Sequence, residues 1–123
     1  MPTLAFRLPW PPSVNRYWRR NPKGRGMFIS AQGRAFREEV AEIVGKITTL
    51  SGEAEVEILA CPPDRRRRDL DNILKATLDA LESAGVVEDD AQFKRILVEQ
   101  GGLDRAGGGH LEVLIRRRTA SAA

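Results

Sequence analysis

The sequence of 123 residues has little of two residues on which several kinds of catalytic site depend. It has one cysteine, Cys61, and one histidine, His110. These counts disfavour an internal disulfide, a cysteine-rich zinc site and a histidine-based catalytic triad. We expect Cys61 to be a small buried hydrophobe in a strand. We expect His110 to be a surface residue at a strand edge, with contact to a phosphate as the alternative. Any catalysis must then rest on carboxylates, lysine and bound metal.

The chain also lacks a long apolar segment. No apolar run approaches the roughly 20 residues that a membrane-spanning helix needs. The residues after Met1 show no basic leader followed by a small-residue cleavage site. A hydrophobic content of 41% is typical of a soluble globular chain, and the length fits one domain. We therefore expect a cytoplasmic protein of one domain, without a membrane partner or a small-molecule cofactor.

Acidic residues are missing from positions 1–37, which hold eight basic residues. Residues 38–64 reverse this balance, with seven acids against Lys46 alone. Two further basic blocks follow, Arg65–Arg68 and Arg116–Arg118. The net charge is only +3, but charge segregated in this way is typical of a surface that binds phosphates.

Hydrophobic periodicity predicts four strands and two amphipathic helices. We expect strands at about 3–8, 53–60, 93–99 and 111–115, and helices at about 31–48, with Ser30 as N-cap, and from near 69 to 84, stopped by Gly85. Residues 9–27 have no period and should form a loop, residues 101–109 a flexible hairpin connection, and residues 119–123 a disordered tail. The order β-α-β-α-β-β predicts an α+β domain over residues 1–118, with both helices on one side of a mixed sheet.

The start of the second helix carries Asp69 and Asp71 directly after Arg65–Arg68. Acids at a helix start commonly act as caps and complement the helix dipole. Capping alone does not call for four adjacent arginines, which repel one another unless an anion offsets their charge. A hard cation such as Mg²⁺ takes oxygen ligands from a few carboxylates and from substrate phosphate, and arginines hold phosphates well. The run therefore favours a metal-dependent nuclease site.

Two further roles in this site have alternatives. Lys75 lies four residues after Asp71 on the same helix face, so it forms either an ordinary ion pair or a contact with the scissile phosphate. A third carboxylate from Glu88, Asp89 or Asp90 would hold the metal better. The helix separates this acidic turn from Asp69 by about 20 Å. The turn reaches the site only if the chain runs back, or if the site forms between elements or subunits.

Aromatic and basic residues alternate in the segment 9–27. Trp10, Tyr17 and Trp18 lie among Asn15, Arg16, Arg19, Arg20, Lys23 and Arg25. Aromatic rings among basic side chains suit stacking on exposed bases and contact with the nucleic-acid backbone. The alternative is that Trp10 packs on the core and the other side chains are solvated.

Several of these motifs together resemble the RusA family of Holliday-junction resolvases. They are the run Pro63–Asn72 (PDRRRRDLDN), Leu8–Ser13 (LPWPPS) with Asn15–Tyr17, Ser30 with Gly33, Ala80–Leu81 with Ala84–Gly85, and Asp89–Gln92. The resemblance spans Leu8 to about Gln92. Carried over position by position, it implies that Asp69, Asp71 and Asp90 bind the metal and that Lys75 is the essential lysine.

The resemblance also implies what the site acts on. It implies a nucleoid-associated homodimer, dependent on Mg²⁺ with Mn²⁺ as a substitute, that makes paired symmetric nicks in four-way DNA junctions during recombination and repair. The expected DNA contacts are Arg65, Arg66, Arg67, Arg68, Asn72, Asn15, Arg16, Tyr17, Arg19 and Arg20. Two alternatives stay open: a catalytically silent module that binds branched DNA, and a ribonuclease or flap-type nuclease with a broader choice of substrate.

Overall fold

The computed structural model describes residues 3–20, 22–24 and 26–118, so the tail expected at 119–123 lies outside the described residues. Its elements are β1 (Leu4–Pro9), α1 (Val14–Tyr17), β2 (Trp18–Arg20), β3 (Met27–Ile29), α2 (Ala31–Val44), β4 (Ala54–Cys61), α3 (Asp71–Ser83), the short 3₁₀ helix η1 (Asp90–Gln92), β5 (Phe93–Gln100) and β6 (His110–Arg117). The main sheet has the order β1-β6-β4-β5. β4 and β5 are parallel and the other pairs antiparallel, so the predicted mixed sheet in an α+β fold is confirmed.

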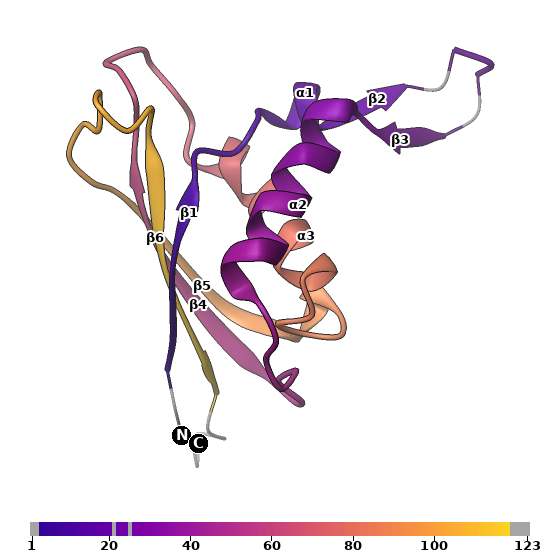
Figure 1. Ribbon diagram of the computed structural model, residues 1–123, viewed down its shortest axis with the longest axis vertical. Helices are drawn as coiled ribbons and strands as arrows, with labels where there is room; N and C mark the ends of the chain where they lie inside the picture. Colours follow the sequence, from indigo (N-terminus) through magenta and orange to yellow (C-terminus); the bar gives the residue numbers. More distant parts are fainter. Residues whose placement is uncertain (1–2, 21, 25, 119–123) are drawn as a thin grey trace.

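The helices α2 and α3 cover one face of this sheet (Figure 1), as predicted. Alternation along β4 explains why, because Val56, Ile58 and Ala60 are buried while Glu55 and Glu57 face the other side. α2 and α3 each bury an apolar stripe against this face, and the core side chains include Phe36, Val40, Ile73, Ala76, Ala80 and Leu81. None of the helices within the described residues is long and apolar enough to cross a membrane.

The connection between β5 and β6 differs from the expected hairpin. β4 lies between these two strands, so residues 101–109 cross over the end of β4 and do not join two paired neighbours. α3 is the crossover that makes β4 and β5 parallel, as such a pair requires. The crossing loop is held in place because Asp104 N–H donates to Pro62 O at 2.8 Å. The error arose because chain order was read as spatial order.

The segment expected to be a loop at 9–27 contains regular structure. It forms the single-turn helix α1 and then the hairpin β2–β3, which extends away from the body of the molecule (Figure 1). Gly33 lets the first turn of α2 pack closely on this segment, since a Cβ at Gly33 would lie 2.7 Å from Tyr17 O. Local periodicity could not show this, because the segment is ordered by contact with α2.

The helix boundaries were predicted within a few residues. α2 begins where Ser30 caps it, with Gly33 N–H donating to Ser30 Oγ at 3.0 Å. It ends at Val44 and not near residue 48, because Gly45 adopts a positive φ of 65°. α3 begins at Asp71, two residues after the predicted start, and ends at Ser83.

Candidate active site

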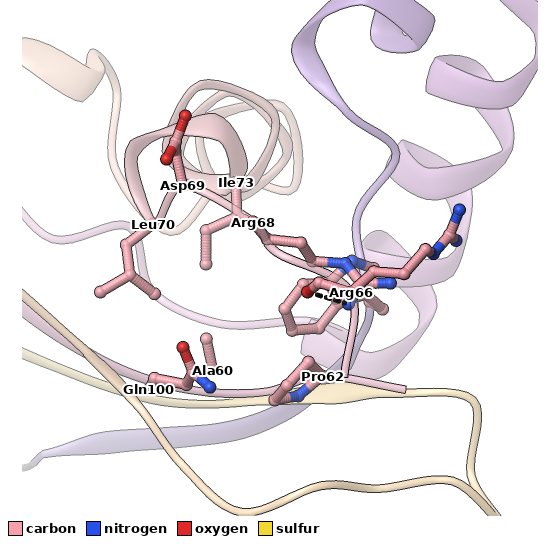
Figure 2. Close-up of a pocket in the computed structure, with 9 residues that line it drawn as sticks. Ala60, Pro62, Arg66, Arg68, Asp69, Leu70, Ile73 and Gln100 are labelled. Carbon is pink, nitrogen blue, oxygen red and sulfur yellow. Dashed lines mark hydrogen bonds between the residues drawn. The ribbon is translucent and has the colours of Figure 1, made fainter. Parts of the chain in front are cut away.

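Asp69 and Asp71 lie at the N-terminal end of α3, with exposed side chains. Capping does not explain them, because Leu70 is the N-cap residue and no side-chain cap hydrogen bond forms there. Asp69 lines a small pocket together with Ala60 and Gln100. In Figure 2 its carboxylate points away from those two residues. Asp71 can still complement the helix dipole. Both carboxylates are free to bind a cation from solvent.

The arginine run before α3 divides into exposed and anchored members. Arg65, Arg66 and Arg67 are exposed, and Arg66 Nε lies 3.4 Å from Asp64 Oδ2. Arg68 is anchored, since its Nη1 lies 2.8 Å from Asp64 Oδ1 and its guanidinium lies 5.5 Å from the centre of the Trp10 ring. The Arg68 side chain, aided by the Arg66 backbone N–H, holds the pKa of the Asp64 carboxyl well below its ordinary value. The contacts of Asp64 with Arg68 and with the Arg66 backbone thus hold the conformation of this run.

A shallow groove brings two distant basic segments together. Arg16 lines it with Arg66, Arg67 and Arg68, beside Trp10, and the groove has a volume of about 400 Å³. A smaller cavity of about 90 Å³ continues from Trp10 to Asp69 and Asn72. The groove therefore leads from the basic side chains to the acidic start of α3. A phosphate backbone lying along it would meet positive charge before it met the carboxylates.

Lys75 is exposed one helical turn after Asp71. The ion pair between these two residues, which was the ordinary alternative, is not formed among the residues that the structure describes. The Lys75 ammonium is therefore available to an anion placed beside the start of α3.

A second acidic group lies at the other end of α3. Oxygens of Glu82, Asp89 and Asp90 lie within 4.8 Å of one another, and the Asp90 N–H donates to Glu82 Oε1 at 2.7 Å. Desolvation and the negative charges of Glu82 and Asp89 raise the pKa of the Asp90 carboxyl above its ordinary value. Carboxylates that crowd in this way favour binding of a hard cation, which would offset their repulsion.

The predicted metal ligands are not brought together within one chain. α3 has 13 residues and separates Asp71 from the Asp90 end by about 20 Å at 1.5 Å per residue. β5 does run back along α3, as it must when β4 and β5 are parallel, but Asp90 precedes that return. The sequence also missed Glu82, which only the fold places beside Asp90. The available signal was its position in the last turn of the helix, just before Gly85 and the acidic residues that follow.

Tyr17 does not present its ring to solvent. Its side chain is fully buried, and its hydroxyl donates to Asp79 of α3 and accepts from Arg37 Nε of α2 at 3.0 Å. Burial, and then the hydrogen bond to Asp79, raise the pKa of Tyr17. The expected stacking of Tyr17 on DNA does not fit this position. Its aromatic and polar contacts join three helices.

The other expected DNA contacts lie on the exposed surface. Asn15 is exposed on α1. Arg19 and Arg20 are exposed on β2 of the projecting hairpin, opposite Phe28 and Met27, which are 45% and 59% exposed. In the basic block at 116–118, by contrast, Arg116 is paired with acidic side chains.

Arg116 lies on the sheet face away from the helices. It pairs with Glu55 and lies 3.1 Å from Glu57. Its charge is therefore offset within the sheet and is not available to phosphates in the way that the sequence suggested.

Comparison with known proteins shows the family of this chain. The family model described as endodeoxyribonuclease RusA matches residues 9–116. The chain is 45% identical over 118 residues to the crossover junction endodeoxyribonuclease RusA of Escherichia coli strain K12, which covers 94% of this chain and 95% of that protein. The proteins of the same name from Enterobacteria phages 82 and HK97 are 47% and 42% identical, with the same coverage. The chain belongs to the RusA family of endodeoxyribonucleases.

Proposed function

We propose that this protein is a divalent-metal-dependent endonuclease that resolves four-way DNA junctions as a homodimer, in DNA recombination and repair. The observation that carries the proposal is the pair Asp69 and Asp71, which cap nothing and lie where an arginine-lined groove meets the start of α3. A binding module has no need of exposed carboxylates at the end of a phosphate groove, because they repel the backbone. A nuclease needs them to hold its metal.

Asp69, Asp71 and Asp90 are the proposed ligands of Mg²⁺, for which Mn²⁺ can substitute. The donor set fits, since hard cations prefer carboxylate oxygens. Desolvation, and then the negative charges of Glu82 and Asp89, raise the pKa of Asp90, and a cation would offset those charges. When bound, Mg²⁺ lowers the pKa of a bound water and stabilises the leaving oxygen. The exposed ammonium of Lys75 offsets charge that builds on the phosphate in the transition state.

A homodimer resolves the separation of these ligands. If two copies of α3 lie antiparallel about a two-fold axis, Asp69 and Asp71 of one copy meet Asp90 of the other. Each dimer then has two such sites, which suits paired symmetric cuts in a junction that is itself two-fold symmetric. An apolar surface is available for this contact. Leu70, Leu74 and Leu78 are only partly buried at intervals of four residues, and Ile96 on the edge strand β5 is 42% exposed.

DNA is proposed to lie in the groove lined by Arg16, Arg66 and Arg67, with Asn72 beside the acidic end of α3. Contacts of this kind are made with phosphates and fix the position of the backbone without reading its sequence. Arg65 and the hairpin residues Arg19 and Arg20 extend the basic surface. The affinity should therefore fall steeply with salt.

Cleavage of a synthetic four-way junction by the wild type and by Asp71→Asn tests the proposal. With Mg²⁺, the wild type should cut two strands symmetrically and EDTA should stop it. Asp71→Asn should bind the junction with similar affinity and cut at least about a hundredfold more slowly. Glu38→Gln, which changes an exposed acid on α2, is the matched control and should cut at the wild-type rate.

Other outcomes would contradict the proposal. Cutting by Asp71→Asn at the wild-type rate would contradict the assignment of Asp71 to the metal site. If no divalent ion allows the wild type to cut, the protein is better explained as a DNA-binding module. Equal cutting of a four-way junction, a flap, a duplex and an RNA hairpin would show a nuclease of broader specificity.

A further inference from the structure

A second group of side chains of the kinds that bind metals lies where β4 ends and β6 begins, on the face of the sheet that the helices leave open. Cys61 at the end of β4 pairs in register with His110 at the start of β6, and Leu59 pairs with Glu112. Residues directly opposite in a sheet point to the same face, and the diagonal neighbour is also within reach. The register thus brings the Cys61 thiol beside an imidazole and a carboxylate that lie 49 and 51 positions later in the sequence.

The donor atoms lie at distances that suit one ion. His110 Nε2 is 3.4 Å from Glu112 Oε2, and Cys61 Sγ is 4.0 Å from the same oxygen. All three donors lie within 4.8 Å of one another. Two ligands about 2.1 Å from a tetrahedral ion lie roughly 3.4 Å apart, and a bond to sulfur lengthens this spacing. Small side-chain adjustments are enough to close the group around an ion.

Asp104 prepares His110 for this role. Its Oδ2 lies 2.7 Å from His110 Nδ1, closer than Arg7 Nη2 at 3.3 Å. Two lone pairs would repel at 2.7 Å, so Nδ1 carries the proton and donates it to Asp104. The Nε2 lone pair then points to the other two donors. A carboxylate that orients a metal-binding histidine through its second nitrogen is a common feature of zinc sites. Asp104 is itself fixed, because its Oδ1 accepts from Gly107 N–H at 2.9 Å.

The charge of this group also favours a cation. Coordination deprotonates a thiol, so a bound Cys61 sulfur would carry a negative charge. Glu112 and Asp104 add two carboxylates to the group. The guanidinium of Arg7, with Nη2 at 3.8 Å from Asp104 Oδ2, supplies one positive charge. A thiolate and two carboxylates would balance this arginine and one divalent ion.

We propose that Cys61, His110 and Glu112 bind a divalent transition-metal ion of the Zn²⁺ class, separate from the hard-metal nuclease site. A thiolate and an imidazole select zinc over Mg²⁺, and three protein ligands leave a fourth position to water. The ion would join the end of β4 to the start of β6. Cys61 directly precedes the segment that leads into the arginine run, so the ion would also fix the base of the groove wall.

Titration of the full-length reduced protein with Zn²⁺ and Co²⁺, in the presence of excess Mg²⁺, tests this site. We expect one Zn²⁺ per chain by calorimetry, a higher melting temperature with Zn²⁺, and a sulfur-to-cobalt charge-transfer absorption with Co²⁺. Cys61→Ala should lose that absorption and bind Zn²⁺ at least tenfold more weakly. Asp104→Asn should keep the absorption but weaken Zn²⁺ binding by about 10- to 100-fold.

Two further variants separate this site from folding and from the nuclease site. His110→Gln keeps the thiol and should weaken binding like Cys61→Ala, which guards against a folding defect of the cysteine variant, while circular dichroism checks each fold. Asp71→Asn should bind Zn²⁺ like the wild type. Wild-type affinity in Cys61→Ala and His110→Gln, or a cobalt complex without the sulfur absorption, would overturn the proposal.

Discussion

The two ends of α3 both carry exposed acids, but their surroundings differ. At the N-terminal end, Asp69 and Asp71 lie beside arginines and a groove that leads to them. At the C-terminal end, Asp90 lies among other acids, with Glu82 and Asp89 within 4.8 Å. One end is suited to hold DNA and the other to draw in a cation. The proposed site needs both ends, and one chain keeps them about 20 Å apart.

The largest of the expected effects is a loss of Mg²⁺ affinity in a variant at the C-terminal end of α3. Glu82→Gln removes one of the acids that crowd Asp90, so the apparent affinity for Mg²⁺ should fall by about 10-fold or more. A titration of junction cleavage against Mg²⁺ measures this change. Glu88→Gln is the matched control, since it changes an exposed acid of the same turn that lies outside the cluster. Equal shifts in both variants would mean that only net charge matters.

A smaller effect is expected at the N-terminal end. Arg67→Ala removes an exposed cation that lines the groove, so junction binding should weaken and the slope of log affinity against log salt should fall by about 1. The Mg²⁺ dependence of cleavage should stay the same. Arg116→Ala provides the control, because Arg116 is already paired with Glu55 and Glu57. A larger loss of salt dependence in Arg116→Ala would show that DNA lies on the open face of the sheet.

The smallest change in DNA binding is expected for Tyr17, which contacts Asp79 between the two ends of α3. Tyr17→Phe removes the buried hydroxyl between Asp79 and Arg37, so it should lower the free energy of unfolding by about 1 kcal/mol. Junction affinity should not change, because the ring is fully buried. Thermal unfolding and junction binding, measured on the same preparation, check both statements. A loss of junction affinity with unchanged stability would show that Tyr17 contacts DNA.

The sequence predicted the local parts of this site and the distance between its two ends, but not the neighbours of Asp90. The run from Arg65 to Asp71 is contiguous, so its composition and spacing were enough to indicate phosphate and metal binding. Alternation in residues 54–61 and the apolar stripe of residues 71–83 likewise predicted β4 and α3. The place of Glu82 beside Asp90 depends on how the turn after α3 folds back, and no periodic pattern records that.

Residues far apart in the chain were the least predictable. The single cysteine and the single histidine argued against a cysteine-rich zinc site and a histidine-based triad. The register of β4 and β6 makes Cys61 and His110 direct neighbours, and that register depends on β6 lying between β1 and β4. Tyr17 was misjudged for the same reason, since it lies among basic residues in sequence and among helices in space.

Mixed dimers test the central claim, that the two ends of α3 from different copies form one site. Asp71→Asn and Asp90→Asn should each be inactive as homodimers. A heterodimer of the two, purified through two different tags, should regain one intact site and nick one strand of the junction with Mg²⁺. A heterodimer of Asp69→Asn with Asp71→Asn should stay inactive, because both changes lie at the same end. If the Asp71→Asn and Asp90→Asn heterodimer is as inactive as its parents, the site is not shared between copies.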